Sequence, residues 1–328
     1  MFNRFIDWFC NKIWPLVDSQ RQILGIQLDI TNACNLACVH CYHPHHKNQG
    51  ALTYEQWLQV LEQYKQLLKK LRMKPSITIC GGEPLLCSFL IPLLENIRKY
   101  FPFCDLSIQT NGTVLTFDQV VSFKKLNVSI QISIDGPNSQ SHDLIRGDGS
   151  FKKSLDGCHL LKTHSIPFWF LAILSEKTAP WIPDFFKLAI TAGASAMNFT
   201  RLVIEGYAKQ LFTLNVDRPL EGKHLKKALK DILEYSREYN VPTETRGALW
   251  HLIDREIGSP NNVGFAGLII SYKGEFKVTS RASMVLGNVL HEGIEKLFLF
   301  HPIMQRLRKG KIEGCGQCRF FDRCRGDR

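Results

Sequence analysis

Three cysteines in one short segment are the residues whose spacing most directly indicates chemistry. Cys34, Cys38 and Cys41 follow the strand-like stretch 24–30 and are separated by three and two residues. Each thiolate can bind one iron of a [4Fe–4S] cube, so three cysteines leave the fourth iron without a protein ligand. The spacing favours such a cluster, with its open iron available to a small molecule.

Zinc is the alternative that the same segment allows. Cysteine and histidine are the usual ligands of structural zinc, and four histidines lie close by, at His40, His43, His45 and His46. Structural zinc usually draws paired ligands from two knuckles, whereas no second C-x2-C pair lies near this segment. The cluster is the favoured interpretation, and the histidines are then expected to be solvated loop residues.

A glycine-rich segment follows the next strand-like stretch. The apolar run 76–80 leads into Gly81-Gly82-Glu83-Pro84, which begins 40 residues after Cys41. Because glycine has no Cβ atom, a ligand can approach the main chain closely, and exposed N–H and C=O groups can bind a zwitterion. This signal is weak alone and strong at a distance of one βα unit from the cysteines.

The elements that must position these residues alternate between strands and helices. Thr53 and Gln56 predict a capping box at the start of a helix whose apolar residues recur up to Met73. Strands are expected at 24–30, 77–80, 106–110, 128–134, 168–174 and 196–200, with helices between them. Six consecutive βα units imply a parallel sheet with right-handed crossovers.

The cysteine spacing, the aromatic Tyr42 that follows it and the Gly-Gly-Glu-Pro segment together resemble the radical SAM superfamily. The resemblance implies an α/β fold, a partial (β/α)6 TIM-like barrel with its ligands at the C-terminal ends of the strands. It also implies that the open iron chelates S-adenosylmethionine (SAM). One electron from the cluster then cleaves SAM to methionine and a 5′-deoxyadenosyl radical, which abstracts hydrogen from a substrate. Gly81 to Pro84 would hold the amino group of the methionine moiety.

Two further motifs fit the same resemblance. Asn111 follows the third expected strand, and Ser133-Ile134-Asp135-Gly136 closes the fourth. Asn-Gly and Asp-Gly are ordinary turn formers, so the dipeptides alone are weak evidence. Their positions at the ends of the third and fourth expected strands are what match the family. In family members this serine commonly reaches the carboxylate or ribose of SAM. Arg146 is a candidate for the SAM carboxylate, because a guanidinium fits a carboxylate bidentately; Ser133 and Arg146 could instead be surface or capping residues.

Beyond residue 200 the pattern changes. A helix at about 220–239 leads to alternating runs within 266–278 that predict a β-hairpin around Lys273-Gly274. Three cysteines follow, in the spacing C-x2-C-x5-C: Cys315, Cys318 and Cys324. This tail resembles the SPASM extension, or its shorter twitch form, which houses auxiliary [4Fe–4S] clusters in peptide-modifying family members.

The match of the tail is incomplete. Gly264 and Ser280-Arg281 stand where those extensions place further cysteines. Three options are open: a second iron–sulfur cluster with a free site, a zinc ion, or a domain that has lost its metal. A metal is expected, because three cysteines within ten residues are hard to explain as core packing.

The expected organisation has four parts. An N-terminal amphipathic helix spans 1–20, the barrel 21–215, a helical link 216–262 and the cysteine-containing extension 263–328. Charges interrupt the first part, unlike the apolar core of a signal peptide. The longest apolar stretch, 166–174, is far below the roughly 20 residues of a membrane span.

Composition narrows the partners and the compartment. Eleven cysteines without a secretory signal favour a cytoplasmic, reducing setting. The net charge of +11 is spread over helices without an aromatic platform, so nucleic acid is not expected. An acidic peptide or a carboxylate-rich small molecule suits that charge better. Five cysteines are expected in the core: Cys10, Cys80, Cys87, Cys104 and Cys158.

Three functional hypotheses follow. The first is a maturase that abstracts hydrogen from a peptide or protein side chain, with a reductant such as flavodoxin or ferredoxin. The second is a radical enzyme of cofactor biosynthesis that acts on a tetrapyrrole side chain, and the third is a non-catalytic metal-binding protein. Arg201 and Glu205 lie in a segment that resembles the end of strand 6 in maturases and haem-pathway members, and they are candidates to face the barrel mouth.

Overall fold

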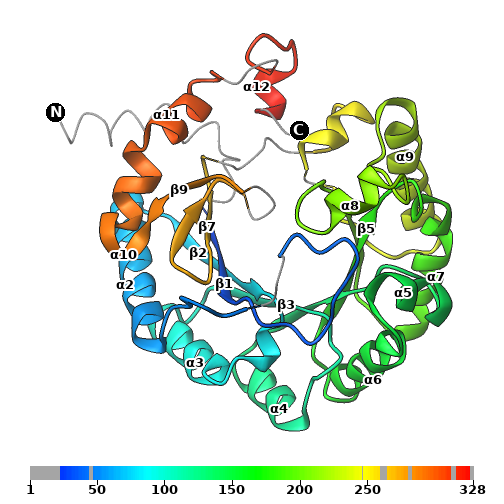
Figure 1. The fold of residues 1–328 in the computed structure, drawn as a ribbon, viewed down its shortest axis with the longest axis horizontal. Coiled ribbons are helices and arrows are strands. Elements are labelled where there is room, and N and C mark those ends of the chain that lie inside the picture. Colours follow the sequence, from blue (N-terminus) through cyan, green and yellow to red (C-terminus); the bar gives the residue numbers. More distant parts are fainter. Residues whose placement is uncertain are drawn as a thin grey trace.

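The computed structural model describes residues 23–43, 47–245, 247–258, 264–279, 283–311 and 315–325. These residues contain a sheet of nine strands in the order β6-β5-β4-β3-β2-β1-β7-β8-β9. The sheet curves around a central space and the helices lie outside it (Figure 1). The expected helix at 1–20 lies outside the described residues.

Six parallel strands form the barrel part of the sheet. Each of them pairs in parallel with the next one along the chain, which confirms the expected partial (β/α)6 barrel. Their bounds are β1 (Ile23–Thr31), β2 (Lys74–Gly81), β3 (Asp105–Thr110), β4 (Ser129–Ser133), β5 (Phe168–Leu174) and β6 (Met197–Arg201).

Helices occupy the connections between these strands. At the start of the first, the predicted capping box is present: Thr53 Oγ1 accepts from Gln56 N at 3.3 Å, and Gln56 Oε1 accepts from Thr53 N at 2.9 Å. The helices of the barrel and its link are α2 (Tyr54–Leu71), η3 (Pro84–Leu86), α3 (Leu90–Tyr100), α4 (Phe117–Lys125), α5 (Ser139–Arg146), α6 (Ser150–Thr163), η4 (Ala179–Trp181), α7 (Ile182–Ala192), α8 (Ala208–Thr213), α9 (Gly222–Glu238) and η5 (Ala248–Leu252).

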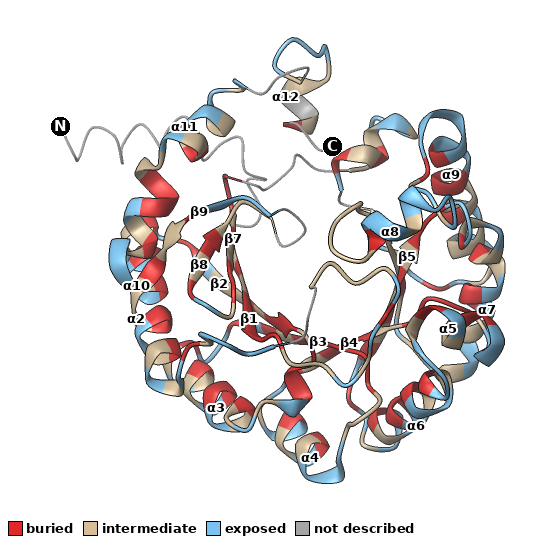
Figure 2. Cartoon of the chain, in the orientation of Figure 1, coloured by how far each residue is buried: buried red, intermediate tan, exposed pale blue. Residues whose placement is uncertain are grey.

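The two faces of the barrel strands differ in chemistry. Ile79, Ile108 and Ile130 belong to the buried apolar core that packs under the helices. The strand residues next to them, Cys80 and Gln131 among others, line a cavity inside the barrel. Side chains alternate between the faces of a strand, so this two-residue period separates the core from the site. Buried residues lie along the strands and on the helix sides that face them (Figure 2).

The C-terminal part of the chain continues the same sheet. The predicted hairpin is confirmed: β7 (Gly267–Ile270) pairs antiparallel with β8 (Glu275–Lys277). The sequence did not predict that β7 would pair in parallel with β1, nor that β9 (Val285–Asn288) would pair with β8. This pairing covers the second edge of β1, which would otherwise present unpaired main-chain groups.

Helices follow β9 along the rest of the described chain. They are α10 (Val289–Glu292), the π-helical turn η6 (Lys296–Phe300), α11 (Pro302–Arg308) and α12 (Phe321–Cys324). None of the helices in the described ranges is long and apolar enough to cross a membrane.

Candidate functional site

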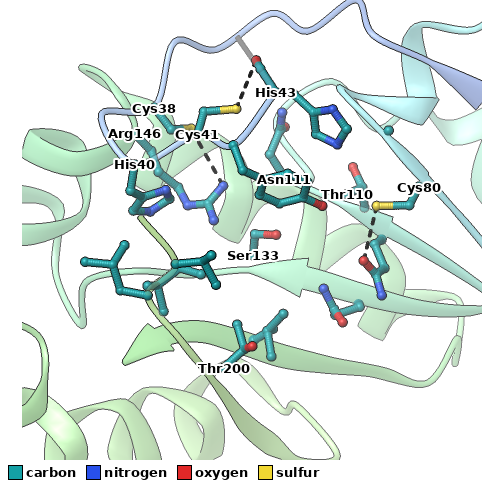
Figure 3. Close-up of a pocket in the computed structure, with 18 of the residues that line it drawn as sticks. Cys38, His40, Cys41, His43, Cys80, Thr110, Asn111, Ser133, Arg146 and Thr200 are labelled. Atoms are coloured by element: carbon teal, nitrogen blue, oxygen red, sulfur yellow. Dashed lines mark hydrogen bonds between the residues drawn. The ribbon is translucent and has the colours of Figure 1, made fainter. Parts of the chain in front are cut away.

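A cavity of about 390 Å³ lies at the C-terminal ends of the parallel strands. All six strands or the loops that follow them contribute to its wall (Figure 3). Most of the residues that the sequence singled out line it: Cys34, Cys38, Cys41, Tyr42, Gly81, Gly82, Asn111, Ser133, Arg146 and Arg201. The structure therefore brings together segments that are far apart in the chain.

The loop that carries the first three cysteines is anchored on both sides. Val39 N donates to Ile145 O at 3.0 Å, and Tyr207 N donates to Cys41 O at 2.9 Å. Gly206 packs so closely on this loop that a Cβ atom there would lie 2.4 Å from Cys41 O, and its φ is +57°. Only glycine suits that position. The segment after β6 therefore presses the cysteine loop onto the barrel.

The donor set of this loop fits the expected cluster. Cys38 is buried, and Cys34 and Cys41 are half-buried. Burial raises the pKa of Cys38 to about 11 and also raises the pKa of the other two, whereas Arg146 acts to lower all three. Arg146 Nη1 lies 3.9 Å from Cys38 Sγ. Three thiols beside a fixed cation suit a metal centre whose ligands are thiolates.

No group of three or more His, Cys, Asp or Glu side chains within the described ranges is arranged around a single metal ion. The three cysteines of the loop line the cavity together. In a [4Fe–4S] cube each cysteine binds a different iron.

Two of the neighbouring histidines are not solvated, so the expectation for them is wrong. The side chains of His40 and His43 are each only 12 % exposed. His40 Nε2 lies 2.7 Å from Asp135 Oδ2, because the loop folds back over the end of β4. His45 and His46 lie outside the described residues.

Asp135 joins four parts of the site. Its carboxylate is fully buried. One oxygen contacts His40 and accepts from Arg146 Nε at 2.6 Å, and the other accepts from Ile173 N at 2.7 Å. Burial alone would raise the pKa of Asp135, but Arg146, His40 and the hydrogen bonds hold it well below its usual range. Asp135 therefore stays ionised and supports the cavity wall from behind.

The Gly-Gly-Glu-Pro segment divides between two roles. Gly81 and Gly82 line the cavity. A Cβ atom on Gly81 would lie 2.2 Å from the carbonyl oxygen of Thr31 at the end of β1, and one on Gly82 would lie 2.3 Å from that of Ala33 in the following loop. Their small size is thus required by packing, beyond the ligand approach that the sequence suggested. Glu83 lies behind them, fully buried.

Glu83 ties the end of β2 to the end of β3. Its Oε1 accepts from Thr110 Oγ1 at 2.6 Å and from Leu85 N at 3.1 Å, and its Oε2 accepts from Asn111 N at 2.8 Å. Burial raises the pKa of Glu83, and these three hydrogen bonds act against that rise. Both oxygens accept hydrogen bonds from the protein, and contact of Glu83 with SAM stays a prediction.

The other candidate residues are placed as follows. Arg201, at the end of β6, lines the cavity, whereas Glu205 is not among its lining residues and pairs with Lys209 at 2.8 Å. Cys80, Cys104 and Cys158 are buried as expected, Cys87 is half-buried, and Cys10 lies outside the described residues. Contact of Ser133, Asn111, Tyr42 or Arg146 with SAM stays a prediction.

Several cavity residues were missed by the sequence analysis. They are polar strand residues inside the barrel and one residue after α9: Gln27, Gln109, Gln131, Asn198 and Glu244. The two-residue alternation within each strand was the available signal, because Gln109 and Gln131 precede Asn111 and Ser133 by two positions.

The tail cysteines lie in consecutive turns. Cys318 N donates to Cys315 O at 2.9 Å, and Cys324 N donates to Phe320 O at 2.8 Å. Cys318 is exposed and the other two are half-buried. Gly264 stands where the SPASM pattern has a cysteine, so this position offers no thiol to a metal. Its carbonyl oxygen accepts a hydrogen bond from Arg308 Nε. Metal binding by the tail stays a prediction.

Comparison with known proteins gives consistent similarities. The model of the radical SAM superfamily matches residues 28–189. The AdoMet-dependent heme synthase of Oleidesulfovibrio alaskensis is 25 % identical over 328 aligned positions, which cover 92 % of this chain and 82 % of that protein.

Two solved structures share the fold. One is anSMEcpe with bound AdoMet and the Kp18Cys peptide, with a TM-score of 0.71 and 22 % identity over 92 % of this chain and 88 % of that one. The other is Streptococcus suis SuiB bound to its precursor peptide SuiA, with a TM-score of 0.73 and 14 % identity over 93 % of this chain and 72 % of that one.

The cysteine loop predicts a specific loss of iron. Replacing Cys34, Cys38 and Cys41 together by Ala should remove about four irons per chain from anaerobically reconstituted protein, because a [4Fe–4S] cluster loses its three thiolates. If the tail holds a second cluster, wild type should contain about eight irons, and Ala at Cys315, Cys318 and Cys324 should remove about four. Iron per chain is the measurement.

The control for both variants is Cys87→Ala, since Cys87 is half-buried and does not line the cavity. It should keep the full iron content. Zinc in the purified protein without iron uptake would contradict the cluster assignment. Equal iron in wild type and in the tail variant would show that the tail carries no cluster.

The contacts of Asp135 predict that its replacement lowers stability with a defined pH dependence. Asp135→Asn should lower the free energy of unfolding by about 3 kcal/mol, because a buried cation loses its charged partner. The native pKa of Asp135 lies below that of an unfolded Asp, near 3.9. Its contribution is therefore complete above about pH 4 and is lost as the pH falls towards the native pKa.

Urea unfolding of the cluster-free protein at several pH values measures this difference. Asp156→Asn is the control, because the Asp156–Lys152 pair is exposed and contributes little. Equal stability of wild type and Asp135→Asn at neutral pH would contradict the role given to Asp135.

Proposed function

This chain belongs to the radical SAM superfamily and is a radical SAM enzyme, and we propose that it abstracts hydrogen from a side chain of a peptide or protein. When bound, the [4Fe–4S] cluster and SAM supply the 5′-deoxyadenosyl radical for that step. The thiols of Cys34, Cys38 and Cys41 would hold the cluster. The main chain at Gly81 and Gly82, with Ser133 and Arg146, would hold SAM.

The observation that carries the proposal is the cavity itself. Its wall joins the three thiols to polar side chains of the parallel strands, at the strand ends where barrel enzymes bind their substrates. Asp135 orients Arg146 and holds the cysteine loop through His40. These residues would fix the reacting groups relative to the barrel and keep water from the site.

A peptide suits the open side of the barrel. β6 is an edge strand of the sheet, and a segment of the chain itself already lies along it: Met197 N donates to Pro242 O at 3.0 Å, and Glu244 N donates to Asn198 Oδ1 at 2.9 Å. This segment covers the edge at Met197 and Asn198, so a substrate peptide would bind in the cavity beside it and not as a further strand at these positions. The fold shared with structures solved with bound peptides supports the same substrate class.

A tetrapyrrole or related cofactor precursor is the second candidate. The similarity to the heme synthase of Oleidesulfovibrio alaskensis covers most of both chains and favours it. Arg201 lines the cavity and would attract a carboxylate of such a molecule. For either substrate class we propose a cytoplasmic setting and a flavodoxin or ferredoxin as the electron donor.

Deuterium transfer separates the two candidates. Cells of the host organism are grown in heavy water, and their peptide fraction and their small-molecule fraction are offered separately to the reconstituted enzyme with SAM and a strong reductant. Mass spectrometry of the 5′-deoxyadenosine then reports which fraction gave up a deuterium atom. We expect deuterium from the peptide fraction.

The Cys34/Cys38/Cys41 triple Ala variant is the control and should give no labelled product, because it cannot form the radical. Deuterium from the small-molecule fraction alone would reject the peptide and support the second candidate.

A further inference from the structure

The floor of the cavity is built from carboxamides. Gln27 of β1, Gln109 of β3, Gln131 of β4 and Asn198 of β6 all line the cavity, and we call them the amide floor. Gln109 and Gln131 precede Asn111 and Ser133 by two positions. At about 3.3 Å per strand residue, this paired couple lies roughly 7 Å deeper than the strand ends where SAM is expected. Gln27 lies two residues deeper still, and Asn198 is level with Ser133.

Gln131 has polar groups that the protein leaves unused. The residue is only 6 % exposed, and its side chain makes no hydrogen bond to any other residue in the described ranges. Its amide nitrogen and oxygen are open to the cavity and are not sealed in the core. The position thus indicates a group that arrives from the cavity and completes its hydrogen bonds.

In each of the other three carboxamides, one end of the amide makes a hydrogen bond within the protein. Gln27 Nε2 donates to Asp29 Oδ1 at 2.8 Å, which directs the Gln27 oxygen away from that carboxylate. Gln109 Oε1 accepts from Cys80 Sγ at 3.2 Å, and Asn198 Oδ1 accepts from Glu244 N. These contacts fix which end of each amide is engaged. The floor therefore offers the NH2 groups of Gln109 and Asn198, the oxygen of Gln27, and both ends of Gln131.

Charge is placed elsewhere. Apart from His40 and His43, the described ionisable side chains that line the cavity and carry a formal charge are Arg146, Arg201 and Glu244, at the ends of α5 and β6 and in the segment after α9. A substrate carboxylate would bind near Arg201, since Arg146 is assigned to SAM. The amide floor presents donors and acceptors without net charge.

We propose that the amide floor binds an amide group of the substrate, either a peptide bond or the side chain of an Asn or Gln. This assignment rests on the proposed function and names the substrate group that the site recognises. An amide carries one donor group and one acceptor, so it can satisfy both ends of Gln131 at once. A carboxylate lacks the donor and an apolar side chain lacks both, and each would leave floor groups unpaired.

The test measures peptide binding without turnover. Wild type and Gln131→Leu are reconstituted and kept oxidised with saturating SAM, and calorimetry gives the affinity for the blocked peptides acetyl-Gly-Xaa-Gly-amide with Xaa as Asn, Asp or Leu. Gln131→Leu should weaken binding of the Asn peptide about tenfold, the loss of one buried hydrogen-bonding partner. Loss for the Asn peptide alone identifies the side chain as the group read; equal loss for all three identifies a peptide bond.

Two further variants secure the result. Gln109→Met preserves volume and should also weaken the same peptide, in case Gln131→Leu alters the fold as judged by circular dichroism. Thr78→Val is the matched control: Thr78 is a half-buried strand hydroxyl that pairs with Ser107 at 3.2 Å and does not line this cavity. It should bind all three peptides as wild type does.

Three outcomes would overturn the proposal. The first is unchanged peptide affinity in both floor variants, and the second is no measurable binding of any peptide by wild type. The third is a loss of SAM affinity, measured without peptide, that equals the loss of peptide affinity; the adenine of SAM would then occupy the floor. Because no reductant is present, floor-dependent binding can stand even if the deuterium experiment fails. The amide assignment and the proposed reaction are therefore tested separately.

Discussion

The site depends on one buried carboxylate. Asp135 follows β4, yet its two oxygens contact the cysteine loop through His40, the end of α5 through Arg146, and β5 through Ile173 N. Arg146, held in this way, lies beside the Cys38 thiol. A cation fixed next to thiols favours their ionised, metal-binding form. The position of the cysteine loop thus follows from this interaction, and Arg146 opposes the rise in cysteine pKa that burial causes.

A second buried carboxylate, that of Glu83, has a comparable role at the ends of β2 and β3. Glu83 accepts from Thr110 and Asn111 and so holds the ends of β2 and β3 together. Gly81 and Gly82 can then pack against the loop after β1. The cavity therefore lies at a junction of strand ends and loops, in which buried carboxylates hold Arg146 and the main chain of Asn111. Such support is what precise positioning of reacting groups requires.

Much of this could be predicted from the sequence. The six strands are marked by apolar runs and turn residues, and the cysteine spacing gives the metal-binding loop. Other features could not be predicted, because they depend on contacts between distant segments. His40 is largely withdrawn from solvent against Asp135, which lies 95 positions away in the chain. The pairing of β7 with β1 is likewise set by an open sheet edge that no local pattern reveals. In the sequence, Gln131 is indistinguishable from an ordinary strand residue, and only the folded barrel shows that it lines the cavity.

The central claim is that the cysteine loop and the strand ends form a working site for SAM cleavage. Its most direct test is the release of 5′-deoxyadenosine from SAM by anaerobically reconstituted protein and a strong reductant, without any substrate. The account predicts slow release by wild type and none by the Cys34/Cys38/Cys41 triple Ala variant, because the cofactor supplies the chemistry and these residues hold it. Equal release by the two proteins would contradict it.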